Sequence, residues 1–201
     1  MIKNVIFDLG RVIYSFCPRE DLLNLGYSEE RADLFMSRVF NAKVWLEMDR
    51  GTYTMAEAIA LLAADFPDMT EDIKKVLNDE WTDRVLYIIP ENLEFFYEVK
   101  QRGYNVYILS NFPKDNFAHV RARDSFYDDA DGIVVSAHEK LLKPDPAIYK
   151  CLLDRYSLKP EETIFIDDMA QNIEAAIKLG IHGIQFTTLE ECKIKFEEII
   201  K

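Results

Sequence analysis

The chain has 201 residues, of which 49% are hydrophobic and 30% are charged, a balance typical of one globular core with room for a small insert. The formal net charge of −12 argues against nucleic acid and anionic membrane surfaces as partners, because both attract basic faces. The three cysteines lie far apart without metal-ligand spacing, and neither a signal-peptide pattern nor a membrane-spanning run is visible, so we expect a cytoplasmic location. The sequence does not define the oligomeric state.

The first residues read as a buried strand. Residues 2–7 are mostly β-branched or aromatic, and Asp8 stands at the C-terminal end of this run. The apolar residues of the segment 18–88 instead follow a helical period, and Gly51 is expected to end one helix there. This segment contains no further strand of the first kind.

From Pro90 onward, predicted helices and strands alternate. Strands are predicted over residues 104–111, 132–136, 163–168 and 183–186, and helices over 90–103, 145–156, 171–180 and the last dozen residues. This alternation predicts an α/β fold with a doubly wound, Rossmann-like parallel sheet covered on both faces. The helical segment 18–88 interrupts the alternation, so we expect it to form a separate lobe.

Polar residues follow several of the predicted strands. In open parallel sheets, ligands bind beyond the carboxyl ends of the strands. That rule brings together Asp8, Ser110, Asn111, Asp167 and Asp168. Lys143 precedes a predicted helix and can lie on the same edge.

Three carboxylates on one edge repel one another, and a hard divalent cation such as Mg²⁺ relieves this repulsion. A metal, the ammonium group of Lys143 and small donors such as Ser110 and Asn111 suit the oxygens of a phosphoryl group. One carboxylate can then act as a nucleophile. Each feature taken alone also fits a structural role, as a turn former or a helix cap.

Four motifs carry a family resemblance: VIFDLG, YILSN, KPDPAIYK and IFIDDMAQNIEAAIKLGI. These motifs and their order along the chain resemble those of the haloacid dehalogenase-like (HAD) hydrolase superfamily. The resemblance covers residues 1–14 and about 89–201, which would form the α/β core domain. Residues 15–88 look like the inserted α-helical cap domain of the C1 type. The branch it most resembles includes sugar-phosphate phosphatases and the N-terminal phosphatase domain of soluble epoxide hydrolases.

The resemblance implies a nucleophile and a Mg²⁺ site. Asp8 would attack phosphorus, and its carboxylate would bind Mg²⁺ together with the backbone carbonyl of Gly10. Asp168 would be the direct metal ligand of the acidic pair, and Asp167 would support the metal's water shell. Asn172 matches a recurrent family asparagine that would orient the acidic loop.

The resemblance also implies a phosphate site and an activity. Ser110 and the Asn111 backbone would hold phosphate oxygens, and Lys143 would bridge the nucleophile and the phosphate. The expected function is a Mg²⁺-dependent phosphatase acting through an aspartyl-phosphate. Its expected substrate is a small phosphorylated metabolite, with a sugar phosphate as one candidate.

Gly10 departs from the family pattern, because family phosphatases usually carry an Asp there that protonates the leaving oxygen. One interpretation is a phosphatase that works without this acid, at a lower rate or on a leaving group that needs little protonation. In a second, another group replaces it; the candidates are Arg11, Tyr14, Glu47 and Asp49. A third is a catalytically weak or inactive module that binds metal and phosphate. A haloacid dehalogenase is less expected, because those relatives work without metal and do not need the acidic pair.

Three side chains around the break at Gly51 raise a question of specificity. Trp45, Met48 and Tyr53 can either face the site or form the core of the helical lobe. Large apolar residues are most often buried in cores, so the second interpretation is favoured.

Overall fold

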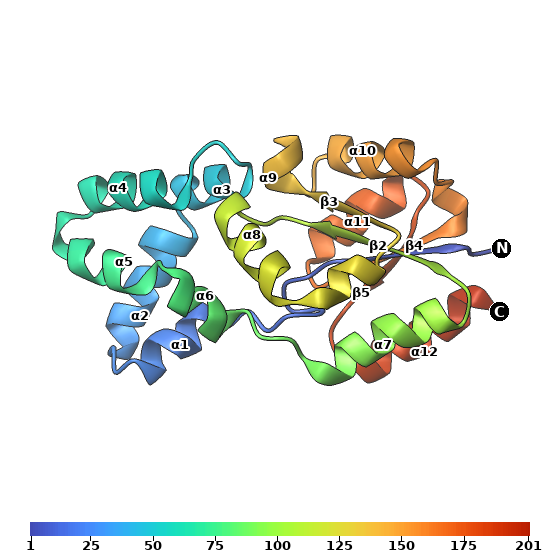
Figure 1. Cartoon of the computed structure of the whole chain (residues 1–201), viewed down its shortest axis with the longest axis horizontal. Helices are drawn as coiled ribbons and strands as arrows, with labels where there is room; N and C mark the ends of the chain where they lie inside the picture. Colours follow the sequence, from blue (N-terminus) through green and yellow to red (C-terminus); the bar gives the residue numbers. More distant parts are fainter.

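The computed structural model describes residues 1–201 and is built around a five-stranded sheet (Figure 1). All the strands run parallel in the order β3-β2-β1-β4-β5, so the predicted doubly wound α/β fold is confirmed. The strands are β1 Asn4–Phe7, β2 Asn105–Ser110, β3 Gly132–Val135, β4 Thr163–Asp167 and β5 His182–Gln185. β1 lies at the centre, so its carboxyl end opens between those of β2 and β4.

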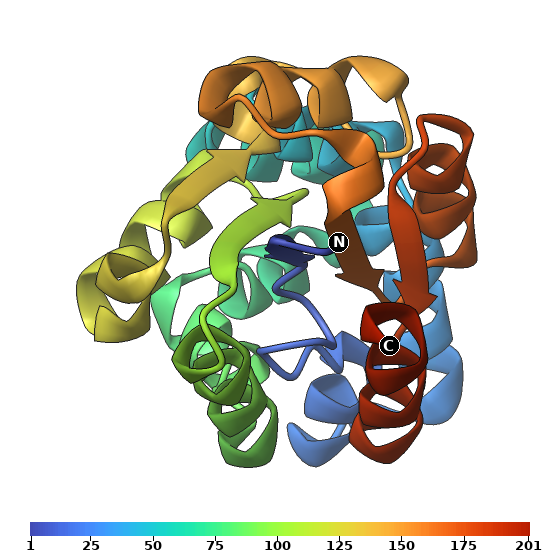
Figure 2. The same ribbon diagram turned by 90° about the vertical axis from the view of Figure 1, so that its right-hand side faces the viewer.

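Side chains alternate between the two faces of the sheet, and each face packs against its own helices. Ile6 belongs to a cluster of 12 buried residues that includes side chains of α10 and α11. Val5 and Phe7 belong to a cluster of 35 buried residues that includes side chains of α7 and α12. Figure 2 shows α10 on one side of the strands and α7 and α12 on the other. Because both faces are covered, the free positions for a ligand lie at the ends of the strands.

The helices of the sheet region begin and end at the expected signals. Pro90 and Pro146 occupy the first turn of their helices, and the Asp145 side chain accepts a hydrogen bond of 2.9 Å from the Ala147 amide. These helices are α7 Pro90–Gln101, α8 Lys114–Arg123, α9 Ser136–Glu139, α10 Pro146–Tyr156, α11 Ala170–Lys178 and α12 Leu189–Ile200, with short 3₁₀ turns η3 Ser125–Asp129 and η4 Pro160–Glu162.

All the elements between β1 and α7 are helices or helical turns, and they lie at the far end of the molecule from the termini (Figure 1). Two connections join this helical segment to the sheet region, and they pair with each other: the Ser15 amide donates to the Tyr87 carbonyl and the Ile89 amide to the Ile13 carbonyl, each at 2.9 Å. Its elements are α1 Pro18–Asn24, α2 Glu29–Phe35, η1 Met36–Phe40, α3 Lys43–Asp49, α4 Met55–Asp65, η2 Pro67–Met69, α5 Thr70–Val76 and α6 Asp79–Val85.

Helix α8 is an addition to the elements predicted from the sequence. Only Phe117 and Val120 form a short apolar spacing within its largely polar run, so its helical signal is weak. None of the helices is both long enough and apolar enough to cross a membrane.

Candidate active site

Asp8 lies directly beyond the central strand, where its carboxylate meets groups from two other segments. The side-chain Oδ1 accepts a hydrogen bond of 2.7 Å from the Ser110 hydroxyl, at the end of β2. The Lys143 ammonium lies 2.9 Å from the same oxygen. All three residues are buried. The parallel order of β1 and β2 explains the meeting of Asp8 with Ser110, because neighbouring strands end at the same edge.

Lys143 links Asp8 to the end of β4. Its ammonium group donates at 2.6 Å to Oδ2 of Asp167 and at 3.0 Å to the Leu109 carbonyl. Asp167 is fully buried, and its other oxygen accepts from the Met169 amide and from the Asn172 side chain at 2.8 and 2.9 Å. Both oxygens of Asp167 are therefore occupied by protein donors.

Asp168 presents a freer carboxylate. Its one ion-pair partner is Arg11, at 3.7 Å. Oxygen atoms of Asp8, Asp167 and Asp168 lie within 4.8 Å of one another, which is a donor set suited to a hard divalent cation. Asp8 Oδ2 and the Asp168 carboxylate could ligate a metal directly. Both oxygens of Asp167 already accept hydrogen bonds from the protein, so this residue could influence a metal only indirectly.

The crowded charges shift the ionisation of this cluster. Burial raises the pKa of Asp8 to about 6, and Asp167 adds to this shift while Lys143 opposes it. Burial also raises the pKa of Asp168, again with a contribution from Asp167. Burial alone would lower the pKa of Lys143, but its two carboxylate partners outweigh that effect and raise it. Lys143 is therefore a fixed positive charge, and the excess of carboxylates favours a bound cation.

Asn111 and Gly10 lie at the same edge in different ways. The Asn111 side chain is occupied by the Lys143 backbone, because its oxygen accepts from the amide at 2.9 Å and its nitrogen donates to the carbonyl at 3.0 Å. This pairing fixes the loop that carries the lysine. A Cβ atom added to Gly10 would meet no other atom within 4 Å, so the missing side chain leaves open space.

A cavity of about 330 Å³ opens at this edge, and residues of the helical segment line part of it. Asp8, Gly10, Ser110 and Asp168 line it from the sheet edge, which we call its floor, and Asp49 at the end of α3 lines it from the helical segment. This volume lies at the lower end of the ~300–1,000 Å³ range of small-molecule sites. The helical segment therefore supplies part of the wall of the candidate site.

The end of α3 is held against the sheet region by its backbone. The Ser136 hydroxyl, at the carboxyl end of β3, donates a hydrogen bond of 2.6 Å to the Asp49 carbonyl. Gly51 has φ +76°, and a Cβ atom there would lie 2.2 Å from the Ala137 carbonyl oxygen. Only glycine permits both this conformation and this close approach. These contacts keep Asp49 beside the cavity.

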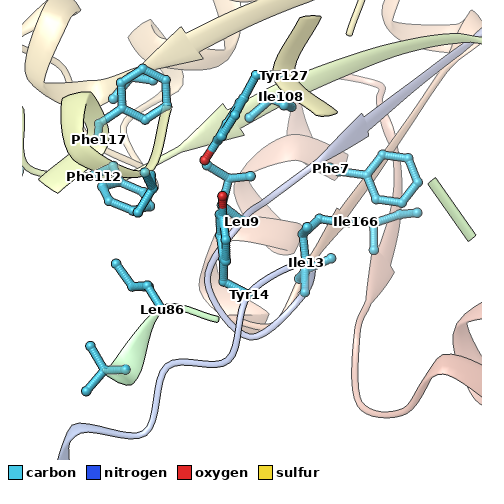
Figure 3. Close-up of a cluster of buried hydrophobic side chains, with 14 of the residues drawn as sticks. Phe7, Leu9, Ile13, Tyr14, Leu86, Ile108, Phe112, Phe117, Tyr127 and Ile166 are labelled. Atoms are coloured by element: carbon cyan, nitrogen blue, oxygen red, sulfur yellow. The ribbon is translucent and has the colours of Figure 1, made fainter. Parts of the chain in front are cut away.

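The structure separates the four candidates for the missing acid. The Tyr14 hydroxyl donates at 2.6 Å to Asp124, and its ring lies next to Tyr127 in an apolar cluster (Figure 3). Glu47 accepts from the Thr52 hydroxyl at 2.7 Å and pairs with Arg50. Neither Tyr14 nor Glu47 lines the cavity.

Arg11 and Asp49 do line the cavity, and Asp49 is the carboxylic acid of the two. Its side chain has no hydrogen-bond or salt-bridge partner in the protein. Burial raises the pKa of Asp49 to about 7, and the charge of Asp8 adds to the shift while Lys143 opposes it. Asp49 can therefore hold a proton near neutral pH while facing the reactive edge.

The three residues around the Gly51 break have different surroundings. Met48 is buried, and neither Met48 nor Tyr53 lines the cavity. Trp45 does line it, which corrects the favoured interpretation of this residue as core only. Trp45 and Asp49 are four residues apart on α3 and so share one helical face, a spacing that is visible in the sequence.

A family model described as haloacid dehalogenase-like hydrolase matches residues 2–180. The chain belongs to the haloacid dehalogenase-like hydrolases. The resemblance drawn from the four motifs is thereby confirmed. The polar edge, the cavity and the helical segment described above are therefore parts of a HAD hydrolase.

The relatives of this HAD hydrolase include enzymes of two activities. The sesquiterpene phosphatase astK of Aspergillus oryzae is 28% identical over 189 residues, which cover 92% of this chain and 90% of that protein. The (S)-2-haloacid dehalogenase 4A of Burkholderia cepacia is 32% identical over 97 residues, which cover 48% of this chain and 42% of that protein. Two further relatives are longer proteins, and the chain spans only 19% and 37% of their lengths.

A solved structure of a HAD family enzyme from Bacteroides thetaiotaomicron is also similar to this HAD hydrolase. It is a complex with magnesium and inorganic phosphate and has 25% sequence identity to this chain. The superposition has a TM-score of 0.74 and covers 92% of this chain and 94% of that one.

Proposed function

We propose that the protein is a Mg²⁺-dependent phosphatase of small phosphate monoesters. The observation that carries the proposal is the arrangement of Asp8 and Asp168 on the floor of one cavity, with the buried Lys143 ammonium 2.9 Å from Asp8. Two carboxylates that each keep an oxygen without a hydrogen bond from the protein, a fixed ammonium group and a hydroxyl suit a phosphoryl group together with a cation. The names of the relatives from A. oryzae and B. thetaiotaomicron, a phosphatase and a magnesium–phosphate complex, support the same reaction.

Asp8 Oδ2, the Gly10 carbonyl and Asp168 would hold the metal. Asp167 would act from outside the ligand set, because both its oxygens already accept hydrogen bonds, and Asn172 would keep it in place. Bound Mg²⁺ would supply electrostatic stabilisation of the phosphoryl oxygens.

In the proposed reaction, Asp8 attacks phosphorus and the bond between phosphorus and the ester oxygen breaks. The products of this step are an aspartyl-phosphate and an alcohol, which takes up one proton as it leaves. Water then attacks phosphorus, releases inorganic phosphate and restores the Asp8 carboxylate. Ser110, the Asn111 backbone and Lys143 would bind phosphoryl oxygens in both steps.

We propose Asp49 as the source of the proton that Gly10 cannot supply. It is the cavity-lining carboxyl group outside the floor, it has no protein partner, and α3 is tied to the sheet edge beneath it. A pKa of about 7 suits a group that gives a proton in one step and takes one back in the next. Residues 15–88 would then act as a cap domain that completes the site, above a core domain of residues 1–14 and 89–201.

The test is hydrolysis of p-nitrophenyl phosphate with Mg²⁺ and with excess EDTA. We expect turnover that requires the metal and is lost in Asp8→Asn, while Asp145→Asn, which changes a helix cap outside the cavity, stays active. Turnover of equal rate in EDTA would overturn the metal requirement, and full activity of Asp8→Asn would overturn the nucleophile.

The same preparation separates the alternatives. Metal-independent release of chloride from 2-chloropropionate, without phosphatase activity, would identify a haloacid dehalogenase. Folded protein that binds Mg²⁺ and phosphate but turns over neither substrate would identify a binding module.

A further inference from the structure

The cavity has two chemically different ends. The polar end contains the residues of the proposed phosphatase reaction. The other end is formed mainly by large apolar side chains from the helical segment and the β2–α8 loop: Phe16, Met36, Phe40, Trp45, Trp81 and Phe112. The polar groups in this second part are few: the Asn41 side chain, the Asn116 amide and the Trp81 indole nitrogen. The Asn116 nitrogen donates at 2.7 Å to Thr82, whereas its oxygen and the Trp81 nitrogen are buried without a hydrogen-bond partner.

The aromatic residues of this apolar end form one packed group. The Phe40 ring centroid lies 4.8 Å from that of Trp45 and 5.4 Å from that of Trp81, stacked on the latter. Trp45 and Trp81 meet edge to face at 6.0 Å. Trp81 is 1% exposed, so its ring is held by the surrounding side chains and supports the other two rings. Trp45 is only half-buried and borders the cavity. A rigid apolar wall of this kind binds carbon skeletons at low entropic cost.

The proposed reaction places the leaving group against this wall. In phosphoryl transfer the attacking and leaving oxygens lie roughly in line. Asp8 attacks from the sheet edge, so the leaving oxygen points away from the sheet and toward the helical segment. The alcohol part of the substrate therefore occupies the apolar end.

A polyhydroxylated alcohol is poorly suited to that position. Each hydroxyl that enters the apolar end gives up its hydrogen bonds to water and finds few partners there, which costs binding free energy. An alkyl, alkenyl or aryl group gains free energy by leaving water for the same surface.

We infer that the substrates are phosphate monoesters of apolar alcohols, with the apolar group held by Phe40, Trp45 and Trp81. The inference rests on the proposed phosphatase function and narrows it to one class of leaving group. A cavity of 330 Å³ holds the volume of roughly eleven water-sized groups at ~30 Å³ each. That space accommodates the phosphoryl group and a short carbon chain, and longer chains would extend out of the opening.

The test uses a series of unbranched alkyl phosphates from methyl to pentyl, with Mg²⁺, and compares pentyl phosphate with glycerol 3-phosphate. These last two have the same number of non-hydrogen atoms and both release a primary alcohol. We expect kcat/KM to rise about fourfold for each added methylene, or on the order of 200-fold over the series. Glycerol 3-phosphate should be much poorer than pentyl phosphate, although glycerol is the more acidic alcohol.

Substitutions in the apolar wall test which side chains cause the preference for longer alkyl groups. Trp45→Ala should lower kcat/KM about tenfold for pentyl phosphate and much less for methyl phosphate, and Trp45→Phe should restore most of the loss. Leu46→Ala is the matched control, because this neighbour is 46% exposed and does not line the cavity.

The outcomes separate this inference from the proposed function. Activity on p-nitrophenyl phosphate combined with a flat alkyl series, or with a preference for glycerol 3-phosphate or a sugar phosphate, would overturn the apolar leaving group and leave the phosphatase intact. A rising alkyl series that Trp45→Ala does not flatten would overturn the assignment of the wall. Absence of turnover on every ester would overturn both proposals.

Discussion

Replacing Asp49 with asparagine removes the proposed proton donor with little change in shape. General acid–base catalysis typically contributes 10²–10⁴-fold, or about 3–5.5 kcal/mol of activation free energy. We therefore expect kcat/KM of Asp49→Asn for an alkyl phosphate to fall by about 10²–10⁴. The rate for p-nitrophenyl phosphate should change far less, because its leaving group needs little protonation.

The pH dependence supplies a second signature. Asp49 must be protonated to act as the acid, so the alkyl-phosphate rate of the wild type should fall as pH rises through about 7. The rate of Asp49→Asn should not show this fall between neutral and alkaline pH. Glu47→Gln is the matched control, because Glu47 lies two residues away on the same helix but is bonded to Thr52 and does not line the cavity.

The same substitution has a consequence for stability that does not depend on activity. Folding raises the pKa of Asp49 from 3.8 to about 7, so the native state binds the extra proton and the free energy of unfolding falls as pH rises through this window. The full shift corresponds to about 4 kcal/mol, but the half-buried carboxyl beside an open cavity is screened by water, which leaves about 1–2 kcal/mol. Metal-free Asp49→Asn should therefore melt about 2–8 °C above the wild type at pH 8 and near it at pH 4.

Gly10→Asp provides the complementary test, because the structure has space for a side chain there. In the Asp49→Asn background it should restore alkyl-phosphate turnover by at least tenfold. Equal losses of Asp49→Asn on aryl and alkyl phosphates, together with an unchanged pH profile, would refute the role of Asp49 as the acid.

Three further outcomes follow from the contacts of the site. Lys143→Met leaves two buried carboxylates without their cation and should destabilise the protein by about 3–5 kcal/mol in urea denaturation at pH 8. Lys150→Met, on the exposed face of α10, is the control and should not change the stability. Equal effects of the two substitutions would contradict the role of the buried charge. In Gly51→Ala the new side chain should strain the positive φ and clash with the Ala137 carbonyl. We expect KM for pentyl phosphate to rise severalfold more than KM for methyl phosphate. An unchanged KM would show that the end of α3 is not positioned by this contact. Mg²⁺ at 100 times its Kd should raise the free energy of unfolding by about 2.7 kcal/mol and therefore raise Tm, and EDTA should reverse the effect. A Tm insensitive to Mg²⁺ would argue against the metal site.

The sheet and its reactive edge could be predicted because both depend on local patterns and one general rule. Each buried run ends at a polar residue, and parallel strands place those ends together, so Asp8, Ser110 and the acidic pair had to meet. Lys143 precedes a helix whose proline and cap are visible in the sequence.

The contribution of the helical segment could not be predicted in the same way. Helical period places Trp45 and Asp49 on one face of α3 and Glu47 on another, but the orientation of that helix depends on distant contacts. These include the hydrogen bond from Ser136 and the close approach of Gly51 to Ala137, which join segments more than eighty residues apart. The sequence therefore leaves four candidates for the acid, and the fold brings Arg11 and Asp49 to the cavity.

The covalent intermediate on Asp8 is the most direct test of the account. The protein would be mixed with Mg²⁺ and p-nitrophenyl phosphate, quenched in acid during turnover and digested, and the peptide that contains Asp8 would be examined by mass spectrometry. We expect a phosphoryl group on Asp8 that hydroxylamine removes and that is absent when EDTA replaces Mg²⁺. Steady turnover with an unmodified Asp8, or with the phosphoryl group on another residue, would contradict the proposed mechanism.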